Sequence, residues 1–261
     1  MIGVFDSGLG GLTVVREIWR QLPGRGVVYL GDTARTPYGT KSRRLIQGYS
    51  LQDADFLISK GAKVIVVACN TASAQAVETL RRHVDVPVFE VVTPAVNSAA
   101  ALTSGRVGVI GTRGTVRSGV YERKMKRLSP RIKVFSSACP LFVPLVEEGW
   151  IKRSETVSIA KEYLRPLRLR RIDTLILGCT HYPFLRSVIP QAVGSEIRLI
   201  DPAHDTVAEL AVYLKQHPEL DAVLRIKRGT SIYVSDLTEH FASLARDWLG
   251  RRLRVRSAEV G

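Results

Sequence analysis

The chain has 261 residues, of which 45% are hydrophobic and 24% charged, and its formal net charge at pH 7 is +14. This length accommodates one large or two small domains with a substantial core, and the composition is typical of a globular protein. The sequence pI near 10.1 raises the hypothesis of an acidic partner such as nucleic acid, although solvated basic faces are the commoner explanation.

The three cysteines, at positions 69, 139 and 179, are too few and too widely spaced for a disulfide framework or a structural zinc site. The N-terminal stretch MIGVFDSG enters a strand-like run at once and has no features of a signal peptide. No apolar run approaches the roughly 20 residues that a membrane helix needs. We therefore expect a soluble, cytoplasmic protein.

Much of the positive charge is clustered. The clusters are RRLIQ at 43–47, YLRPLRLRRID at 163–173, RIKRG at 225–229 and RRLRVR at 251–256. None of them is part of a zinc finger, an RNA-recognition signature or a convincing helix-turn-helix. The charge alone therefore does not identify a nucleic-acid-binding module.

Short β-branched runs alternate with segments of helical period in the first part of the chain. The predicted strands cover residues 2–6, 27–30, 63–68 and 86–92. In the segment before the third strand, Leu45, Tyr49 and Phe56 fall on one helical face. Alternating strands and helices predict a parallel sheet with right-handed crossovers.

The same pattern then begins again. A second set of strands is predicted at residues 106–112, 131–137, 173–178 and 196–201. IGVFDSGLGG resembles VGVIGTRGTV, and KVIVVACNT resembles DTLILGCTH. Because Gly3 and Gly108 are 105 residues apart and Cys69 and Cys179 are 110 apart, we infer one duplicated α/β unit.

The boundary between the two units is predicted near residues 92–97, where Pro94 follows a strand. Residues after about 205 are predicted to form extra helices and a strand at 231–236 that fold back on the first half. The predicted domains are residues 1–94 with about 206–261, and about 95–205. The fold class is α/β, with two pseudosymmetric three-layer domains, mainly parallel sheets and an active site in the cleft between the domains.

Two cysteines, Cys69 and Cys179, each follow the carboxyl end of a predicted buried strand, where ligands bind in open parallel sheets. If the two halves face each other, both thiols reach one cleft from opposite walls. This arrangement suits stereoinversion, which needs a base on one face of a carbon and an acid on the other. We expect a helix to begin directly after each cysteine, and the dipole of that helix would favour the thiolate. Cys139 reads instead as a small buried hydrophobic residue.

Polar residues beside the cysteines are candidates for assisting roles. Asp6 ends the first strand and His181 lies two residues after Cys179, so either could orient groups or relay a proton. The stretch DSGLGGLT at 6–13 has neither the GxGxxG spacing nor a Walker lysine. It could hold a small carboxylate at a helix start, or be only a tight turn. TPYG at 36–39 and NTAS at 70–73 are common loop sequences that could bind a zwitterion beside the cysteines.

Several long motifs in the same order resemble those of the glutamate racemase family, within the aspartate/glutamate racemase superfamily, over nearly the whole chain. They are GVFDSGLGGLTV at 3–14, YLGDTARTPYG at 29–39, VVACNTAS at 66–73, CPLFVPLVEEG at 139–149 and LGCTHYP at 177–183. The resemblance implies interconversion of L- and D-glutamate, which supplies D-glutamate for peptidoglycan in the cell wall. It also implies a homodimer that uses no pyridoxal phosphate, metal or nucleotide.

The resemblance also implies roles for individual residues. The acid–base pair would be Cys69 and Cys179, assisted by Asp6, His181 and Glu147, with Glu148 as the alternative to Glu147. The implied substrate contacts are Asp6, Ser7, Tyr38, Gly39, Asn70, Thr71, Thr180 and His181.

Two other functions remain open at this stage. A related racemase or isomerase acting on aspartate, a hydantoin or maleate would keep the fold and the cysteines. A basic protein that mainly binds nucleic acid or DNA gyrase would explain the charge, which is higher than the resemblance implies. Some relatives are described as gyrase inhibitors, and the basic surface does not decide this question.

Overall fold

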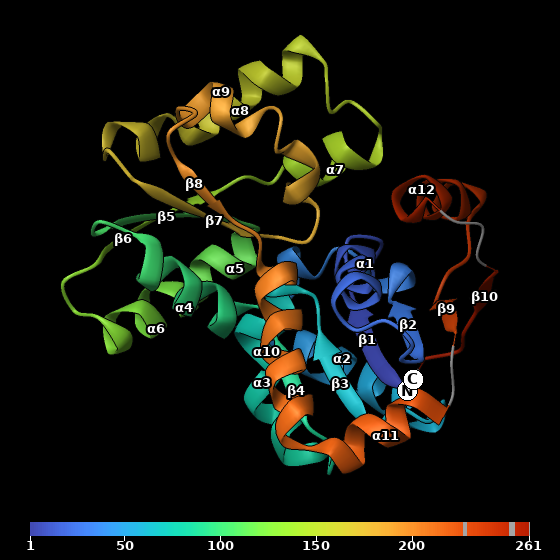
Figure 1. The fold of residues 1–261 in the computed structure, drawn as a ribbon. Coiled ribbons are helices and arrows are strands. Elements are labelled where there is room, and N and C mark those ends of the chain that lie inside the picture. Colours follow the sequence, from blue (N-terminus) through green and yellow to red (C-terminus); the bar gives the residue numbers. More distant parts are fainter. Residues whose placement is uncertain (227–228, 251–253, 261) are drawn as a thin grey trace. The chain divides into compact units, whose positions relative to one another are not determined.

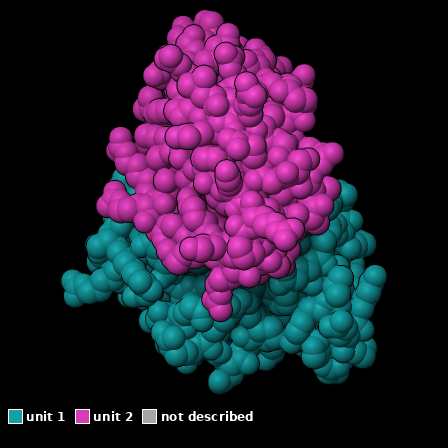
Figure 2. Space-filling view, turned by 90° about the vertical axis from the view of Figure 1, so that its left-hand side faces the viewer, with its two compact units in different colours: residues 1–91, 203–261 teal, residues 92–202 magenta. Residues whose placement is uncertain are grey.

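The computed structural model describes residues 1–226, 229–250 and 254–260 (Figure 1). The chain divides into two compact units, which are coloured separately in Figure 2. Unit 1 is Met1–Val91 with Ala203–Gly261, and unit 2 is Val92–Pro202. Residues 227–228 and 251–253, which belong to two of the predicted basic clusters, lie outside the described residues. No helix in the described ranges is long and apolar enough to cross a membrane.

Unit 1 contains a six-stranded sheet in the order β10-β9-β2-β1-β3-β4, with every neighbouring pair parallel. The strands are β1 (Ile2–Asp6), β2 (Val27–Gly31), β3 (Val64–Val67), β4 (Val88–Glu90), β9 (Thr230–Val234) and β10 (Val255–Ser257). The C-terminal segment joins this sheet because β9 pairs with β2. All of these strands except β10 were predicted from the sequence.

Helices flank this sheet in unit 1, and two pairs of them pack against each other. The helices are α1 (Leu12–Gln21), α2 (Arg43–Ser59), α3 (Asn70–His83), α10 (Pro202–Gln216), α11 (Pro218–Ile226) and α12 (Glu239–Leu249). Helix α2 packs against α3, and α1 packs against α12. Two short 3-10 helices, η1 (Thr33–Arg35) and η2 (Tyr38–Thr40), follow β2 and precede α2.

The buried face of α2 includes polar side chains as well as apolar ones. Its buried residues are Ile46, Ser50, Asp53, Ala54 and Leu57, whereas Leu45 is 38% exposed and Tyr49 and Phe56 are half-buried. A hydrophobic pattern places carboxylates in solvent, but Asp53 is buried here because it is paired with Arg35 and hydrogen-bonded to Tyr38.

Unit 2 contains a four-stranded sheet in the order β6-β5-β7-β8, again with every pair parallel. The strands are β5 (Arg106–Gly111), β6 (Lys133–Ala138), β7 (Thr174–Gly178) and β8 (Arg198–Ile200). The helices are α4 (Val92–Leu102), α5 (Arg113–Ser118), α6 (Val120–Leu128), α7 (Phe142–Glu147), α8 (Ser154–Leu169), α9 (Ile189–Val193) and the 3-10 helix η3 (Tyr182–Leu185). Figure 1 shows α8 and α9 on one side of the sheet and α4, α5 and α6 on the other.

The two sheets repeat one another in strand order and register. The order β2-β1-β3-β4 in unit 1 corresponds to β6-β5-β7-β8 in unit 2. Gly3 pairs with Ile65, and Gly108 pairs with Leu175. Cys69 lies four residues after Ile65, and Cys179 lies four residues after Leu175. The predicted internal repeat is therefore present in the structure, and the two cysteines occupy equivalent positions in it.

Gly31 is predicted to be intolerant of a side chain, because an added Cβ would lie 2.6 Å from the carbonyl oxygen of Gly8. A backbone atom in a packed loop cannot move aside cheaply, so Gly31→Ala should lower the free energy of unfolding by about 1–3 kcal/mol. Gly48 is the matched control, because it lies at an exposed position of α2 with nothing within 4 Å of an added Cβ. Gly48→Ala should raise stability by about 0.4–1 kcal/mol. Urea unfolding measures both changes, and equal effects of the two substitutions would show that Gly31 is not sterically constrained.

Candidate active site

In unit 1, the carboxyl ends of β1 and β3 bring together predicted site residues from two parts of the chain. Strand β1 ends at Asp6, and the Ala68 N–H after β3 donates to the carbonyl of Phe5. The Cys69 Sγ lies 3.7 Å from the Ser7 Oγ. The Asp6 carboxylate accepts a hydrogen bond from the Gly8 N–H at 3.1 Å, which fixes the loop that carries Ser7.

Cys69 is the N-cap of α3, and its sulfur accepts a hydrogen bond from the Ala72 N–H at 3.5 Å. The helix begins at Asn70, directly after the cysteine, as predicted. The positive end of a helix dipole stabilises negative charge placed at its first turn. The position of Cys69 therefore favours a thiolate. Asn70 and Thr71, in the first turn of α3, are buried beside it.

Tyr38 and Gly39 lie in η2 and are both buried. The Tyr38 hydroxyl is hydrogen-bonded to Asp32 and, at 2.9 Å, to Asp53. Because the side chain is already fully engaged, any ligand contact from Tyr38 would be made by its backbone.

In unit 2, Cys179 follows β7 directly and is 7% exposed. The prediction that a helix begins directly after this cysteine was wrong. The Cys179 N–H bonds to the carbonyl of Leu177 and the Tyr182 N–H bonds to the carbonyl of Cys179, so the chain turns sharply. Only the four-residue 3-10 helix η3 follows, from Tyr182, and it gives Cys179 no helix dipole comparable with that of α3.

The imidazole of His181 lies beside Cys179, whereas Cys69 lies at the N-terminus of a helix. Its Nδ1 lies 3.9 Å from the Cys179 Sγ and 3.5 Å from the Thr180 Oγ1. Its Nε2 lies 2.9 Å from the Glu147 Oε1 at the end of α7. Glu148, the alternative from the sequence, is exposed, so Glu147 is the glutamate that contacts this histidine.

Burial on its own would lower the pKa of His181, but hydrogen bonds and charge interactions with Cys179 and Glu147 outweigh it and raise that pKa to about 10. His181 is therefore an imidazolium at neutral pH. Its Nδ1 then presents a protonated nitrogen toward the Cys179 sulfur at 3.9 Å. The two cysteines thus have different neighbours, a helix N-terminus for Cys69 and an imidazolium for Cys179.

The third cysteine has a different environment. The Cys139 thiol is fully buried and donates to the carbonyl of Ser137 at 3.8 Å. Burial raises the pKa of this thiol, which keeps it protonated. All three cysteines are free. Cys139 therefore fits the predicted role of a small buried hydrophobic residue.

Sequence reasoning missed Asp32, Arg35 and Asp53, which form a cluster around the Tyr38 hydroxyl. Arg35 pairs with Asp32 at 2.7 Å and with Asp53 at 3.1 Å. The available signal was the motif GDTAR at 31–35, which places a carboxylate at the end of a buried strand. No comparable signal marks Asp53, because its partners lie on a separate segment of the chain.

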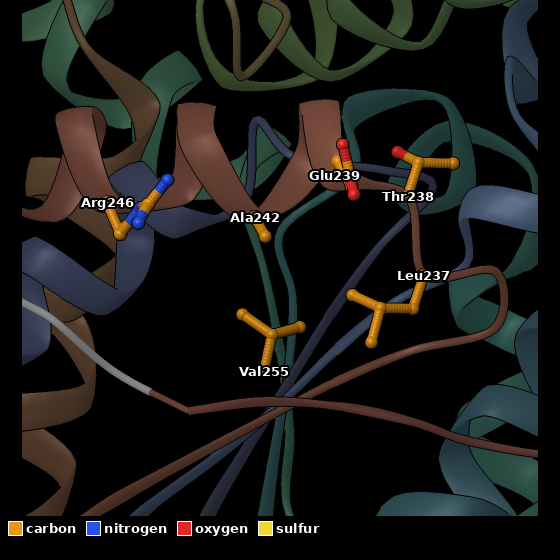
Figure 3. A pocket seen from close by; sticks show the side chains of 6 residues that line it. All are labelled: Leu237, Thr238, Glu239, Ala242, Arg246 and Val255. Atoms are coloured by element: carbon orange, nitrogen blue, oxygen red, sulfur yellow. The ribbon is translucent and has the colours of Figure 1, made fainter.

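A pocket of about 590 Å³ lies elsewhere in unit 1, beside α12 (Figure 3). Its lining residues are Leu237, Thr238, Glu239, Ala242, Arg246 and Val255. It contains none of the predicted site residues. Within the described part of the chain, no group of three or more His, Cys, Asp or Glu side chains is arranged to hold a metal ion.

The family model described as Asp/Glu/Hydantoin racemase matches residues 2–210, and the chain belongs to this family. It is 47% identical to the glutamate racemase of Geobacter metallireducens, covering 97% of this chain and 93% of that protein. It is 42% identical to that of Streptococcus gordonii, covering 99% and 98%. The predicted resemblance and the predicted enzyme class, an amino-acid racemase, are confirmed.

Solved structures of family members have the same fold. The glutamate racemase isoform RacE1 of Bacillus anthracis superposes with a TM-score of 0.92 at 37% identity, covering 99% of this chain and 97% of that one. The glutamate racemase of Francisella tularensis, solved in complex with D-glutamate, gives a TM-score of 0.91 at 37% identity, covering 100% and 97%. The predicted α/β class with mainly parallel sheets is confirmed.

The contact between His181 and Glu147 predicts a specific shift in titration. Glu147→Gln removes the negative charge 2.9 Å from Nε2, so the pKa of His181 should fall from about 10. Glu148→Gln, at the exposed neighbouring position, should leave it unchanged. NMR titration of the His181 imidazole protons distinguishes the two variants, and an equal response to both substitutions would contradict the assignment of Glu147.

The same shift has a consequence for stability. The folded-state pKa of His181 is raised to about 10, above an unfolded value of about 6.5, so the protonated imidazole stabilises the fold. That contribution is complete below about pH 6.5 and is lost as the pH rises through about 10. In Glu147→Gln, we expect this stabilisation to be lost at a lower pH than in the wild type. Unfolding measured at a series of pH values tests this expectation. Superimposable profiles for the wild type and this variant would show the coupling to be absent.

Proposed function

We propose that this chain is a glutamate racemase that interconverts L- and D-glutamate by a two-base mechanism, with Cys69 and Cys179 as the acid and base and without a cofactor. The observation that carries the proposal is the equivalent placement of two buried thiols outside any disulfide, each four residues beyond the same point of a repeated sheet. The similarity to proteins named glutamate racemase supports glutamate as the substrate. So does the similarity to a racemase solved with D-glutamate.

The proposed reaction consists of two proton transfers. A thiolate removes the proton from Cα of one enantiomer, and the protonated thiol on the other side delivers a proton to the opposite face of the same carbon. The thiols exchange protonation states in each turnover, and their roles are reversed in the back reaction. The mechanism requires the two thiols to act on opposite faces of one Cα.

The proposed assisting groups differ between the two thiols. For Cys179, the His181 imidazolium and the Glu147 carboxylate would hold charge and relay protons, which their distances of 3.9 Å and 2.9 Å support. For Cys69, α3 would stabilise the thiolate and Asp6 would orient the loop through its bond to Gly8. A carboxylate so placed is better suited to orientation than to stabilising a second negative charge.

The proposed substrate contacts are those that the family resemblance implies. They are Asp6, Ser7, Asn70, Thr71, Thr180, His181 and the backbone of Tyr38 and Gly39. Hydroxyl, amide and N–H donors suit the two carboxylates of glutamate, and the Asp6 carboxylate suits its ammonium group. We also propose that the enzyme works in the cytoplasm and supplies D-glutamate for peptidoglycan synthesis. We expect it to be a homodimer, which sedimentation in solution would detect.

Each active-site cysteine should be essential. A serine hydroxyl is a far weaker acid than a thiol and cannot supply the base at neutral pH, so Cys69→Ser and Cys179→Ser should each lower kcat/KM by at least about 100-fold. Cys139→Ser is the matched control and should retain most of the activity. Circular dichroism of each enantiomer follows the racemisation, and substantial activity in either of the first two variants would exclude the two-base mechanism.

An alternative within the same family is a racemase whose preferred substrate is aspartate or a hydantoin. The fold and the thiols would be unchanged and only the contacts to the side chain of the substrate would differ. A substrate panel decides between these functions. A higher kcat/KM on another acid than on glutamate would replace the proposed substrate.

The basic charge supports a second candidate function, the binding of a polyanion such as nucleic acid. Unit 2 has 18 Lys and Arg against 8 Asp and Glu, so it carries +10 of the total charge of +14. Arg106 and Arg170 both lie over the Phe135 ring, at 5.2 Å and 5.5 Å from its centroid. Binding to DNA gyrase has no support beyond the charge.

Phosphate-driven binding weakens steeply with salt. If unit 2 binds nucleic acid, a mobility-shift assay should give a complex at low salt that is lost as salt approaches the physiological concentration. Absence of a complex even at low salt would remove direct nucleic-acid binding from consideration.

A further inference from the structure

A buried chain of oxygen atoms in unit 1 connects the loop after β2 with helix α2. The Tyr38 hydroxyl contacts the Asp32 Oδ2 and lies 2.9 Å from the Asp53 Oδ2. All three side chains are 0% exposed. The two carboxyl groups take no part in the proposed proton transfers, so their convergence on one hydroxyl needs a separate explanation.

The number of protons in this cluster is limited. A tyrosine hydroxyl has one proton and can donate to only one of the two carboxyl oxygens. If both aspartates were ionised, the other carboxylate would face a lone pair on the hydroxyl oxygen in a buried setting, which is strongly unfavourable. One aspartate must therefore carry a proton and donate it to Tyr38.

The surrounding donors indicate which aspartate is protonated. Asp32 also accepts hydrogen bonds from the Ser235 Oγ at 2.8 Å and the Arg35 Nε at 2.7 Å, which suits a carboxylate. Asp53 receives only the Arg35 Nη2, at 3.1 Å and on its other oxygen.

The charges around Asp53 point the same way. Burial and then the negative charge of Asp32 raise its pKa well above the usual value, with a further contribution from Asp6. The hydrogen bond from Tyr38 and the charge of Arg35 oppose this shift without cancelling it. Burial also raises the pKa of Tyr38, so the hydroxyl stays protonated.

We propose that Asp53 is a neutral carboxylic acid at physiological pH and a positioning residue for the active site. It donates to Tyr38, Tyr38 donates to the Asp32 carboxylate, and the chain of hydrogen bonds fixes the backbone of Tyr38 and Gly39. Only the further step, in which this backbone contacts the substrate, rests on the proposed function.

The packing around Tyr38 connects this cluster to the catalytic thiol of unit 1. The Tyr38 ring belongs to the same core cluster as Cys69 and Ala72, and η2 contacts α3. The centroid of the Tyr38 ring also lies 5.7 Å from that of the Tyr49 ring, over which the Arg35 guanidinium lies at 4.3 Å. A change in the Tyr38 hydrogen bonds would therefore displace η2 against the helix that begins after Cys69.

Substitution by asparagine tests the protonation state through activity. The amide NH₂ of Asp53→Asn can donate to Tyr38 as a protonated carboxyl does, so this variant should keep kcat and KM within about twofold of the wild type. Asp53→Ala removes the donor, and the loss of one buried hydrogen bond should raise KM for glutamate about tenfold with a smaller change in kcat. Asp32→Asn removes the charge that Arg35, Tyr38 and Ser235 share, and should be more damaging than Asp53→Asn.

Two further measurements do not depend on activity. Infrared spectroscopy at neutral pH should show the carbonyl band of a buried carboxylic acid that disappears in Asp53→Asn. Hydrogen exchange of the Gly39 amide should be faster in Asp53→Ala than in the wild type and unchanged in Asp53→Asn.

The outcomes are separable. Absence of the acid band, or equal damage from Asp53→Asn and Asp32→Asn, would overturn the protonated state. An unchanged KM and unchanged exchange in a folded Asp53→Ala protein would overturn the positioning role. If the wild type does not racemise glutamate, the proposed function fails, and the infrared and exchange results still decide the state of Asp53 and its effect on η2.

Discussion

Parallel pairing of β1 with β3, and of β5 with β7, is the constraint on which the rest of the site depends. Parallel strands bring their carboxyl ends to the same edge, so the residue that follows each buried strand meets its neighbours there. The pairing is fixed because β1, β3 and β7 are buried at every position. A change of register would move the cysteine of either unit away from its polar partners.

The two cysteines occupy equivalent positions in the repeat but have different electrostatic surroundings. Cys69 caps a 14-residue helix and accepts a backbone N–H, whereas Cys179 is followed by a sharp turn and stands beside His181. The imidazolium depends on Glu147, which reaches it from α7. The two units therefore share the position of the thiol but differ in the groups that surround it.

The strands and the two cysteines could be predicted because both leave a local signal. A buried parallel strand reads as a short apolar run, and a cysteine with polar followers at its end is conspicuous. Strand β10 was missed because Val255–Ser257 is a three-residue edge strand in which Arg256 and Ser257 are polar and exposed. The absence of a helix after Cys179 was missed because the decisive bonds, such as that from the Cys179 N–H to Leu177, are properties of the turn.

The cluster around Tyr38 shows a different limit of sequence reasoning. The helical pattern places the apolar residues Leu45 and Tyr49 on one face of α2, but the buried face contains Asp53. A carboxyl group is tolerated there only because Tyr38 and Arg35 come from another segment to meet it. Likewise, the contact between His181 and Glu147 joins residues 34 apart in sequence. The family motifs indicated both residues, but the spacing between them did not predict their contact.

The most direct test of the two-base mechanism is proton NMR of the purified protein with L-glutamate in D₂O, without added cofactor and alongside optical rotation. Proton abstraction at Cα predicts that the α-proton signal disappears as deuterium enters and that the rotation falls to zero. If a folded sample with reduced thiols leaves both the α-proton and the rotation unchanged, glutamate is not the substrate and the proposed function is contradicted at its centre.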